Sequence, residues 1–119
     1  MFQGQPNPED IQCATRTTSG TMVTVPAGRW YGCYMSISAS VAVAGSSNPV
    51  ITVNGLNAAP AAGTVVARLN LDGLALTTVS GTMTIPLVVK APLGNSVTID
   101  FTAGASGTSS ATINGYIYG

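Results

Sequence analysis

The sequence contains no histidine and very few charged residues of either sign. Histidine is the commonest general base and a frequent metal ligand, so its absence removes the usual proton shuttle and prevents a Ser or Cys triad from being completed. The four basic and four acidic side chains make up 7% of the 119 residues, whereas about 25% is typical of soluble domains. These absences exclude most enzymes, and we expect no catalytic residue, no cofactor and no metal site.

The basic residues are too scattered to form a nucleic-acid site. Arg16, Arg29, Arg68 and Lys90 lie far apart in the sequence, and the net charge is zero. Binding to a phosphate backbone needs clustered lysine and arginine. We therefore expect no nucleic acid among the partners. The four cations serve either to pair with carboxylates of a partner or to discourage pairing at the edges of a sheet.

Long hydrophobic runs are also missing. The longest apolar runs, at 40–44 and 85–89, are much shorter than the roughly 20 residues of a membrane-spanning helix. Residues 1–10 have neither the basic region nor the apolar region of a signal peptide. We expect no membrane among the partners and no signal peptide.

Cys13 and Cys33 are the only cysteines, which is too few for a disulfide scaffold. Both lie in apolar, strand-like sequence, so we interpret them as two small buried thiols. A disulfide that joins them is the alternative. No histidine or second cysteine pair is present to complete a tetrahedral metal site.

Apolar and polar residues alternate along much of the chain, which predicts β-strands. The clearest runs are 35–43, with Met35 and Ile37 on one face, and 97–102, with Val97, Ile99 and Phe101 on one face. Further strands are predicted at 11–16, 21–25, 50–53, 64–71, 74–79, 82–89 and 111–118. The fold class is therefore all-β, a jelly-roll-like antiparallel β-sandwich of eight or nine short strands. We expect an extended N-terminal arm at 1–10 and a single β-sandwich domain at 11–119.

Several short segments predict the connections between these strands. Asp72-Gly73 and Asn54-Gly55 are candidates for tight turns, because both residue types tolerate a positive φ. Gly115 follows Asn114 inside the last apolar run, where it indicates a bulge or a close approach of two backbones. The alanine-rich segment 57–63 is predicted to cross between the two sheets.

The scarcity of charge bears directly on the protein surface. A folded chain of this size exposes about 6,000 Å², and eight charges leave most of that area uncharged. Hydroxyl and amide groups cost less to desolvate than ions, so such a surface suits permanent burial between subunits. Zero net charge also removes the self-repulsion that keeps monomers apart. We expect an assembly component that forms a homo-oligomer.

The C-terminal third carries a resemblance to a known family. It lies in residues 91–100, the Gly/Ser-rich turn at 104–109 and the strand at 111–116, together with the turn at 25–31. These segments resemble the small jelly-roll capsid decoration (cement) proteins of tailed bacteriophages. The resemblance implies a homotrimer that binds the major capsid protein where capsid hexamers meet. It also implies synthesis in the host cytoplasm and a place on the outer capsid surface of the virion.

Two groups of residues are candidates for the interface with partners. The N-terminal arm contributes Met1, Phe2, Gln3, Gln5, Pro6 and Pro8, because its prolines disfavour pairing within the sheet and Phe2 could anchor it on a neighbour. An arm folded back on its own domain is the alternative. The aromatic candidates are Trp30, Tyr31, Tyr116 and Tyr118, since Trp and Tyr are typical interface anchors. Plugging the ends of the core, or forming a carbohydrate platform, are the alternatives for these rings.

The function expected from these features is capsid decoration, with the protein bridging major capsid subunits and stabilising the assembled shell. The alternative is a carbohydrate- or receptor-binding tip module of a tail fibre or adhesin. An ordinary coat subunit is a third possibility.

Overall fold

The computed structural model describes residues 10–41, 49–56, 63–69, 79–104 and 108–119. Four of the predictions lie wholly or mostly outside these residues. They are the arm residues Met1, Phe2, Gln3, Gln5, Pro6 and Pro8, most of the segment at 57–63, the turn at Asp72-Gly73 and most of the strand predicted at 74–79.

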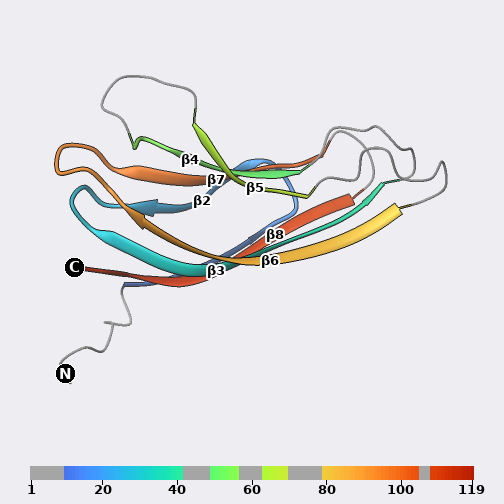
Figure 1. Ribbon diagram of the computed structural model, residues 1–119, viewed down its shortest axis with the longest axis horizontal. Coiled ribbons are helices and arrows are strands. Elements are labelled where there is room, and N and C mark those ends of the chain that lie inside the picture. Colours follow the sequence, from blue (N-terminus) through green and yellow to red (C-terminus); the bar gives the residue numbers. More distant parts are fainter. Residues whose placement is uncertain (1–9, 42–48, 57–62, 70–78, 105–107) are drawn as a thin grey trace.

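Eight strands form two four-stranded sheets that pack face to face (Figure 1). Sheet A has the order β1-β8-β3-β6, and sheet B has the order β2-β7-β4-β5. Every pair of neighbours is antiparallel. The strands are β1 (Ile11–Arg16), β2 (Gly20–Val25), β3 (Trp30–Val41), β4 (Val50–Asn54), β5 (Thr64–Arg68), β6 (Val79–Lys90), β7 (Val97–Thr102) and β8 (Thr108–Tyr118).

The strand pairing confirms the jelly-roll prediction. The chain runs outward through β1, β2, β3 and β4 and returns through β5, β6, β7 and β8, and each returning strand pairs with an outgoing one. The nested pairs are β4 with β5, β3 with β6, β2 with β7 and β1 with β8. This is a long hairpin wrapped into two sheets, which is the jelly-roll arrangement. In sheet A, β3 and β6 each have 12 residues and β8 has 11, so these three strands are longer than predicted, whereas β1 has the predicted bounds.

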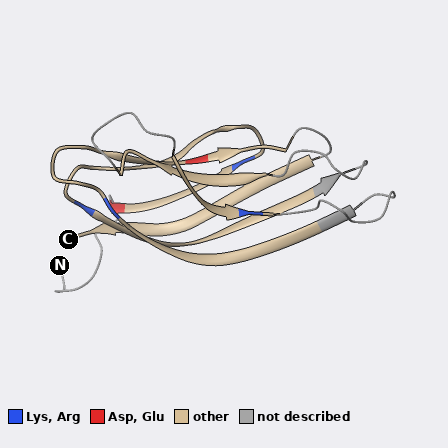
Figure 2. Ribbon diagram, turned by 45° about the horizontal axis from the view of Figure 1, so that its top comes forward, with Lys and Arg blue, Asp and Glu red and all other residues tan. Residues whose placement is uncertain are grey.

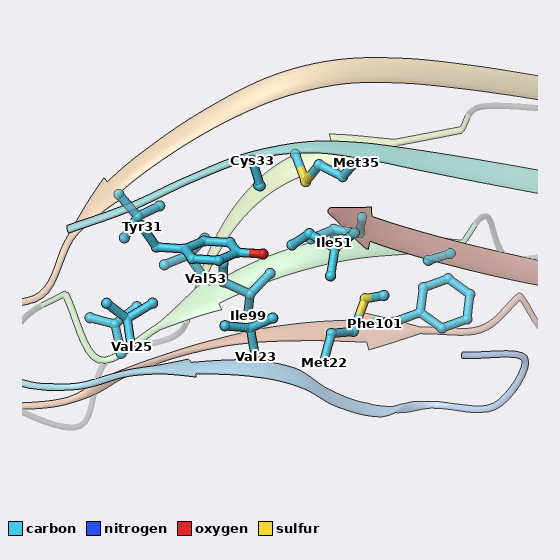
Figure 3. Packing of buried hydrophobic residues seen from close by; sticks show 14 of the residues in the cluster. Met22, Val23, Val25, Tyr31, Cys33, Met35, Ile51, Val53, Ile99 and Phe101 are labelled. Carbon is cyan, nitrogen blue, oxygen red and sulfur yellow. The ribbon is translucent and has the colours of Figure 1, made fainter. Parts of the chain in front are cut away.

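The core lies between the sheets and is filled by the alternate residues of each strand (Figure 3). On β3, Met35 and Ile37 are each 1% exposed, and on β7, Val97, Ile99 and Phe101 are at most 1% exposed, as their alternation predicted. No polar or charged residue is fully buried in the described part of the chain. The hydrophobic effect of this apolar layer holds the two sheets together.

Two of the predicted connections can be compared with the structure. The described strands on either side of the segment at 57–63, β4 and β5, are paired neighbours in sheet B, so the prediction of a crossover between sheets is wrong. Alternation alone cannot tell which strands share a sheet. Gly115 does mark a close approach, because a Cβ there would meet the carbonyl oxygen of Gly32 and lie 2.5 Å from Cβ of Cys33. The register of β8 against β3 continues through this point without a bulge.

The cysteines are free thiols. Cys33 is buried, as predicted, whereas Cys13 is exposed, so the interpretation of two buried thiols is wrong for Cys13. Cys13 and Asn114 are register partners, and both are exposed on the outer side of sheet A. The alternation around Cys13 is too weak to show which of its neighbours face the core.

Candidate interaction surface

The outer face of sheet A is the candidate interaction surface. Successive side chains of a strand point to opposite faces, so burial of Tyr31, Met35 and Ile37 places Trp30 and Tyr34 on the outside of β3. The register then identifies the outward residues of the neighbouring strands, because Trp30 lies opposite Tyr118 on β8 and Lys90 on β6.

Large apolar side chains gather at one end of this face. Tyr34 is 67% exposed and Val88 is 60% exposed, although both belong to long paired strands, β3 and β6. We call the group the aromatic patch, and its members are Ile11, Trp30, Tyr34, Val88, Tyr116 and Tyr118. Contiguous exposed apolar groups of this kind mark interaction sites more often than isolated ones do.

The rings of the patch are ordered by contacts with one another. Trp30 and Tyr118 stack with centroids 6.2 Å apart and planes inclined by 14°. Tyr116 lies beside Tyr118, with centroids 5.3 Å apart and planes at 43°. Lys90 Nζ is 5.5 Å from the centroid of the Trp30 ring, within the range of a cation–π contact. Ordered rings lose little conformational entropy when a ligand covers them.

Tyr31 is the predicted aromatic residue that does not belong to this surface. Its side chain is 0% exposed and its hydroxyl donates a 2.7 Å hydrogen bond to the carbonyl oxygen of Gln12. Burial raises the pKa of Tyr31 well above its ordinary value. The side chain of Tyr31 therefore fills the core, which was the alternative to an interface role for this ring. It offers no surface area to a partner.

The structure adds residues that were not among the predicted interface set. Ile11, Tyr34 and Val88 complete the patch, since Ile11 lies opposite Tyr116, and both Val88 and Tyr116 lie opposite Gly32. Tyr34 could have been found from the sequence, because it lies four positions from Trp30 and therefore on the same face of one strand. Ile11 and Val88 needed the register between strands.

The rest of the outer face of sheet A carries hydroxyl groups. Thr15 and Thr112 lie opposite one another with their Oγ1 atoms 3.1 Å apart, and Ser38 Oγ is 3.2 Å from Thr82 Oγ1. We call this set the hydroxyl field, and its members are Thr15, Ser36, Ser38, Thr82, Thr84, Thr108, Ser110 and Thr112. Strands β3 and β8 contain no charged residue, and the only one in β6 is Lys90 at its end (Figure 2).

The charged groups of the described chain are mostly engaged in local structure. Arg29 and Asp10 form a 3.5 Å ion pair near the start of β1. The guanidinium of Arg16 donates to the carbonyl oxygens of Thr18 and Ser19, so it holds the turn between β1 and β2. These contacts fix the ends of strands.

Asp100 carries the one carboxylate in the middle of sheet B. Thr21 Oγ1 donates to Asp100 Oδ1 over 2.6 Å, and Thr98 Oγ1 donates to Oδ2 over 3.0 Å. The amide Nδ2 of Asn54 also donates to Oδ2. These three donors come from β2, β7 and β4, so the carboxylate links neighbouring strands across the outer side of the sheet.

The described residues contain no group of three or more His, Cys, Asp or Glu side chains suited to hold a metal ion. Within the same residues, no helix has the length and apolar character needed to cross a membrane. An open cavity of about 610 Å³ at one end of the sandwich is lined mainly by small and hydroxyl side chains, among them Ser38, Thr82 and Thr108. Comparison with known proteins adds no assignment, because no protein-family model and no curated protein matches the chain.

Proposed function

We propose that this protein is a capsid decoration protein that binds an assembled viral shell through the outer face of sheet A and bridges major capsid subunits. The observation that carries the proposal is the composition of that face. The exposed aromatic patch lies at one end, the hydroxyl field covers most of the rest, and the two central strands of the sheet, β3 and β8, carry no formal charge.

The physical argument rests on the cost of desolvation. Covering a hydroxyl group that finds a new partner costs little, whereas covering an unpaired ion costs much more. The exposed rings and Val88 supply the apolar area that drives association, with Tyr and Trp as the residue types that most often dominate binding energy. The hydroxyl field can exchange its water contacts for hydrogen bonds to a protein surface.

The proposed mechanism involves no covalent step. A ligand that binds only the assembled lattice stabilises that state in proportion to its occupancy, because free subunits gain nothing from it. A protein bound across the junction of two capsid subunits must dissociate before they separate. It therefore raises the temperature at which the shell ruptures.

A carbohydrate- or receptor-binding tip module is the second candidate. The observation in its favour is the nearly parallel pair of rings formed by Trp30 and Tyr118, which lies on the sheet face with the exposed Asn114 on the same side. Sugar rings stack on such aromatic faces, and amide groups bind their hydroxyls. This function uses the same patch but a different partner.

Binding to shells and to glycans distinguishes the two candidates. The wild-type protein is added to empty shells and to free subunits of the major capsid protein from the phage that encodes it. We expect sedimentation with the shells alone and a rupture temperature several degrees higher. Tyr34→Ser should weaken binding strongly, whereas Leu93→Ser should not, since Leu93 is 88% exposed but lies outside the patch.

Two results would contradict the capsid proposal. The first is absence of shell binding by a folded protein. The second is equal loss of binding from Tyr34→Ser and Leu93→Ser, which would mean that the patch is not the contact. A different result would support the tip module instead: the wild type binds glycans on an array but does not bind shells, and Trp30→Ala abolishes the glycan binding.

A further inference from the structure

The β-sandwich is closed along one edge and open along the other. At the closed edge, β1 and β2 are consecutive strands that contact each other across the two sheets. At the opposite edge, β6 ends sheet A and β5 ends sheet B, and no comparable contact between them occurs in the described residues. Apolar groups are exposed on this side, with Val65 of β5 at 46% and Val88 of β6 at 60%.

Strand β6 presents a long unpaired edge. It pairs with β3 over all 12 residues without a break in register, and no described strand pairs with its other side. Between Val79 and Val89 it contains no charged residue. Such an edge exposes a row of backbone donors and acceptors to any strand that can pair with it.

The other edge strands carry the features that usually protect an edge. Strand β1 has six residues and ends at Arg16, and strand β2 has an irregularity between Thr21 and Val23. Strand β5 has only five residues and ends at Arg68. Short length, bulges and charges all discourage edge pairing. Strand β6 also contains Pro86, which removes one donor, and ends at Lys90, but over its 12 residues the other backbone groups that point away from β3 stay available.

The inward side chains of β6 are incompletely covered. Their register partners on β3 are Cys33, Met35 and Ile37, which are at most 8% exposed. On β6 the corresponding side chains are only partly buried, and they are Met83, Ile85 and Leu87. An additional strand next to β6 would extend the apolar layer over them.

We propose that β6 pairs antiparallel with β6 of a second copy of this chain, so that the two copies of sheet A form one continuous sheet about a two-fold axis. A register centred on Ile85 places Met83 of each copy opposite Leu87 of the other, which continues the apolar side of the layer. On the outer side, Thr84 then lies opposite Pro86, and Thr82 opposite Val88.

Charge placement favours a second copy in this orientation. Lys90 is the only charge of the strand and lies at its end. In an antiparallel pair of β6 strands the two Lys90 side chains lie at opposite ends of the pair. In a parallel pair these like charges would lie side by side. The edge is therefore complementary to itself, which is the requirement for a two-fold interface.

The inference is independent of capsid binding, because it concerns only how two copies join. It differs from the trimer that the family resemblance implies, since a two-fold interface closes at two copies. It also unites the surfaces described above, because Val88 of the aromatic patch lies on β6 and two patches would share one extended face.

A matched pair of lysine substitutions tests the proposal. Thr84 on β6 and Thr15 on β1 are both exposed threonines on the outer face of sheet A, each on an edge strand. We expect the wild type to sediment at twice the 11.9 kDa of one chain. Thr84→Lys should raise the dimer dissociation constant by about tenfold or more, because the lysines of the two copies become diagonal neighbours across the β6–β6 pair. Thr15→Lys should leave the dissociation constant unchanged.

Cross-linking gives a second measurement that does not depend on weakening the dimer. In a Cys13→Ser background, Ile85→Cys places two thiols opposite one another at the axis, and oxidation should give a species of two chains on a non-reducing gel. Thr15→Cys in the same background is the control and should not cross-link, so it should run as a single chain on the same gel. A wild type that sediments as one or three chains, or equal cross-linking through both positions, would overturn the proposal.

Discussion

The hydroxyl of Tyr31 on β3 donates a 2.7 Å hydrogen bond to the backbone carbonyl oxygen of Gln12 on β1. In sheet A, β8 lies between these two strands, so the bond connects strands that are not neighbours. The ring of Tyr31 is fully buried among the core residues (Figure 3). One side chain thus fills the core and ties an edge strand to the centre of its sheet.

Removal of this hydroxyl should weaken the fold without emptying the core. We expect Tyr31→Phe to lower the free energy of unfolding by about 1 kcal/mol, because a buried hydrogen bond is lost while the ring remains. Urea denaturation followed by circular dichroism measures the change. Tyr34→Phe is the control, since Tyr34 is 67% exposed, and it should leave stability unchanged. Equal effects of the two substitutions would contradict the importance of the Gln12 contact.

The two cysteines should differ sharply in reactivity. Cys13 is exposed, whereas Cys33 is buried and burial raises its pKa to about 11, so little of its reactive thiolate forms at neutral pH. A thiol reagent at neutral pH should label one cysteine quickly and the second only after denaturation. The Cys13→Ser variant should show no fast labelling. Absence of fast labelling in the wild type would mean that Cys13 is covered or oxidised.

Stability should fall at alkaline pH because burial raises the pKa of both Cys33 and Tyr31, and Cys33 has the lower ordinary value of the two. The fold raises the pKa of this thiol from 9.0 to about 11, mainly through burial, so it favours the protonated form. The resulting stabilisation is fully present below pH 9 and is lost as the pH rises through 11. It amounts to about 2–3 kcal/mol. Denaturation curves recorded between pH 8 and 11 give the free energy of unfolding at each pH. Its decrease with rising pH should be shallower in Cys33→Ala than in the wild type. An identical slope in that variant would rule out this thiol as the cause.

The contact at Gly115 should tolerate no side chain. A Cβ at this position would collide with the carbonyl oxygen of Gly32 and with Cys33, both on β3. We expect Gly115→Ala to destabilise the protein by about 2 kcal/mol or more, because the central pair of sheet A must separate to accept the methyl group. Gly94→Ala is the control, since a Cβ there has no atom within 4 Å. Thermal denaturation compares the two, and similar melting temperatures would contradict the close approach.

Much of the fold could be predicted from the sequence because alternation is a local property. The run from Met35 predicted which residues of β3 face the core, and the run from Val97 did the same for β7. The segment at 57–63 was misplaced, because no local signal reports whether two successive strands pair in one sheet or lie in different sheets. That choice depends on long-range pairing.

The interaction surface was only partly predictable for the same reason. Trp30 and Tyr31 are adjacent in the sequence, yet one contributes to the outer face and the other to the core. The alternation that is clear in the sequence starts at Met35, and only the structure shows that the strand extends back to Trp30, which places Tyr31, four positions before Met35, on the inward face. Ile11 and Val88 come from strands far apart in the chain, and only the register of β1, β8, β3 and β6 brings them to the same patch.

The sequence by itself determined that the chain forms strands, that those strands have one apolar side, and that very little charge would be found on any surface. These properties follow from residue type and spacing, which act locally. The tertiary structure decided which strands are neighbours, which aromatic rings are exposed together, and that β6 rather than β1, β2 or β5 presents the long uncharged edge. Such relationships arise only when distant segments pair, because hydrogen bonds between strands join whichever residues the register brings opposite one another.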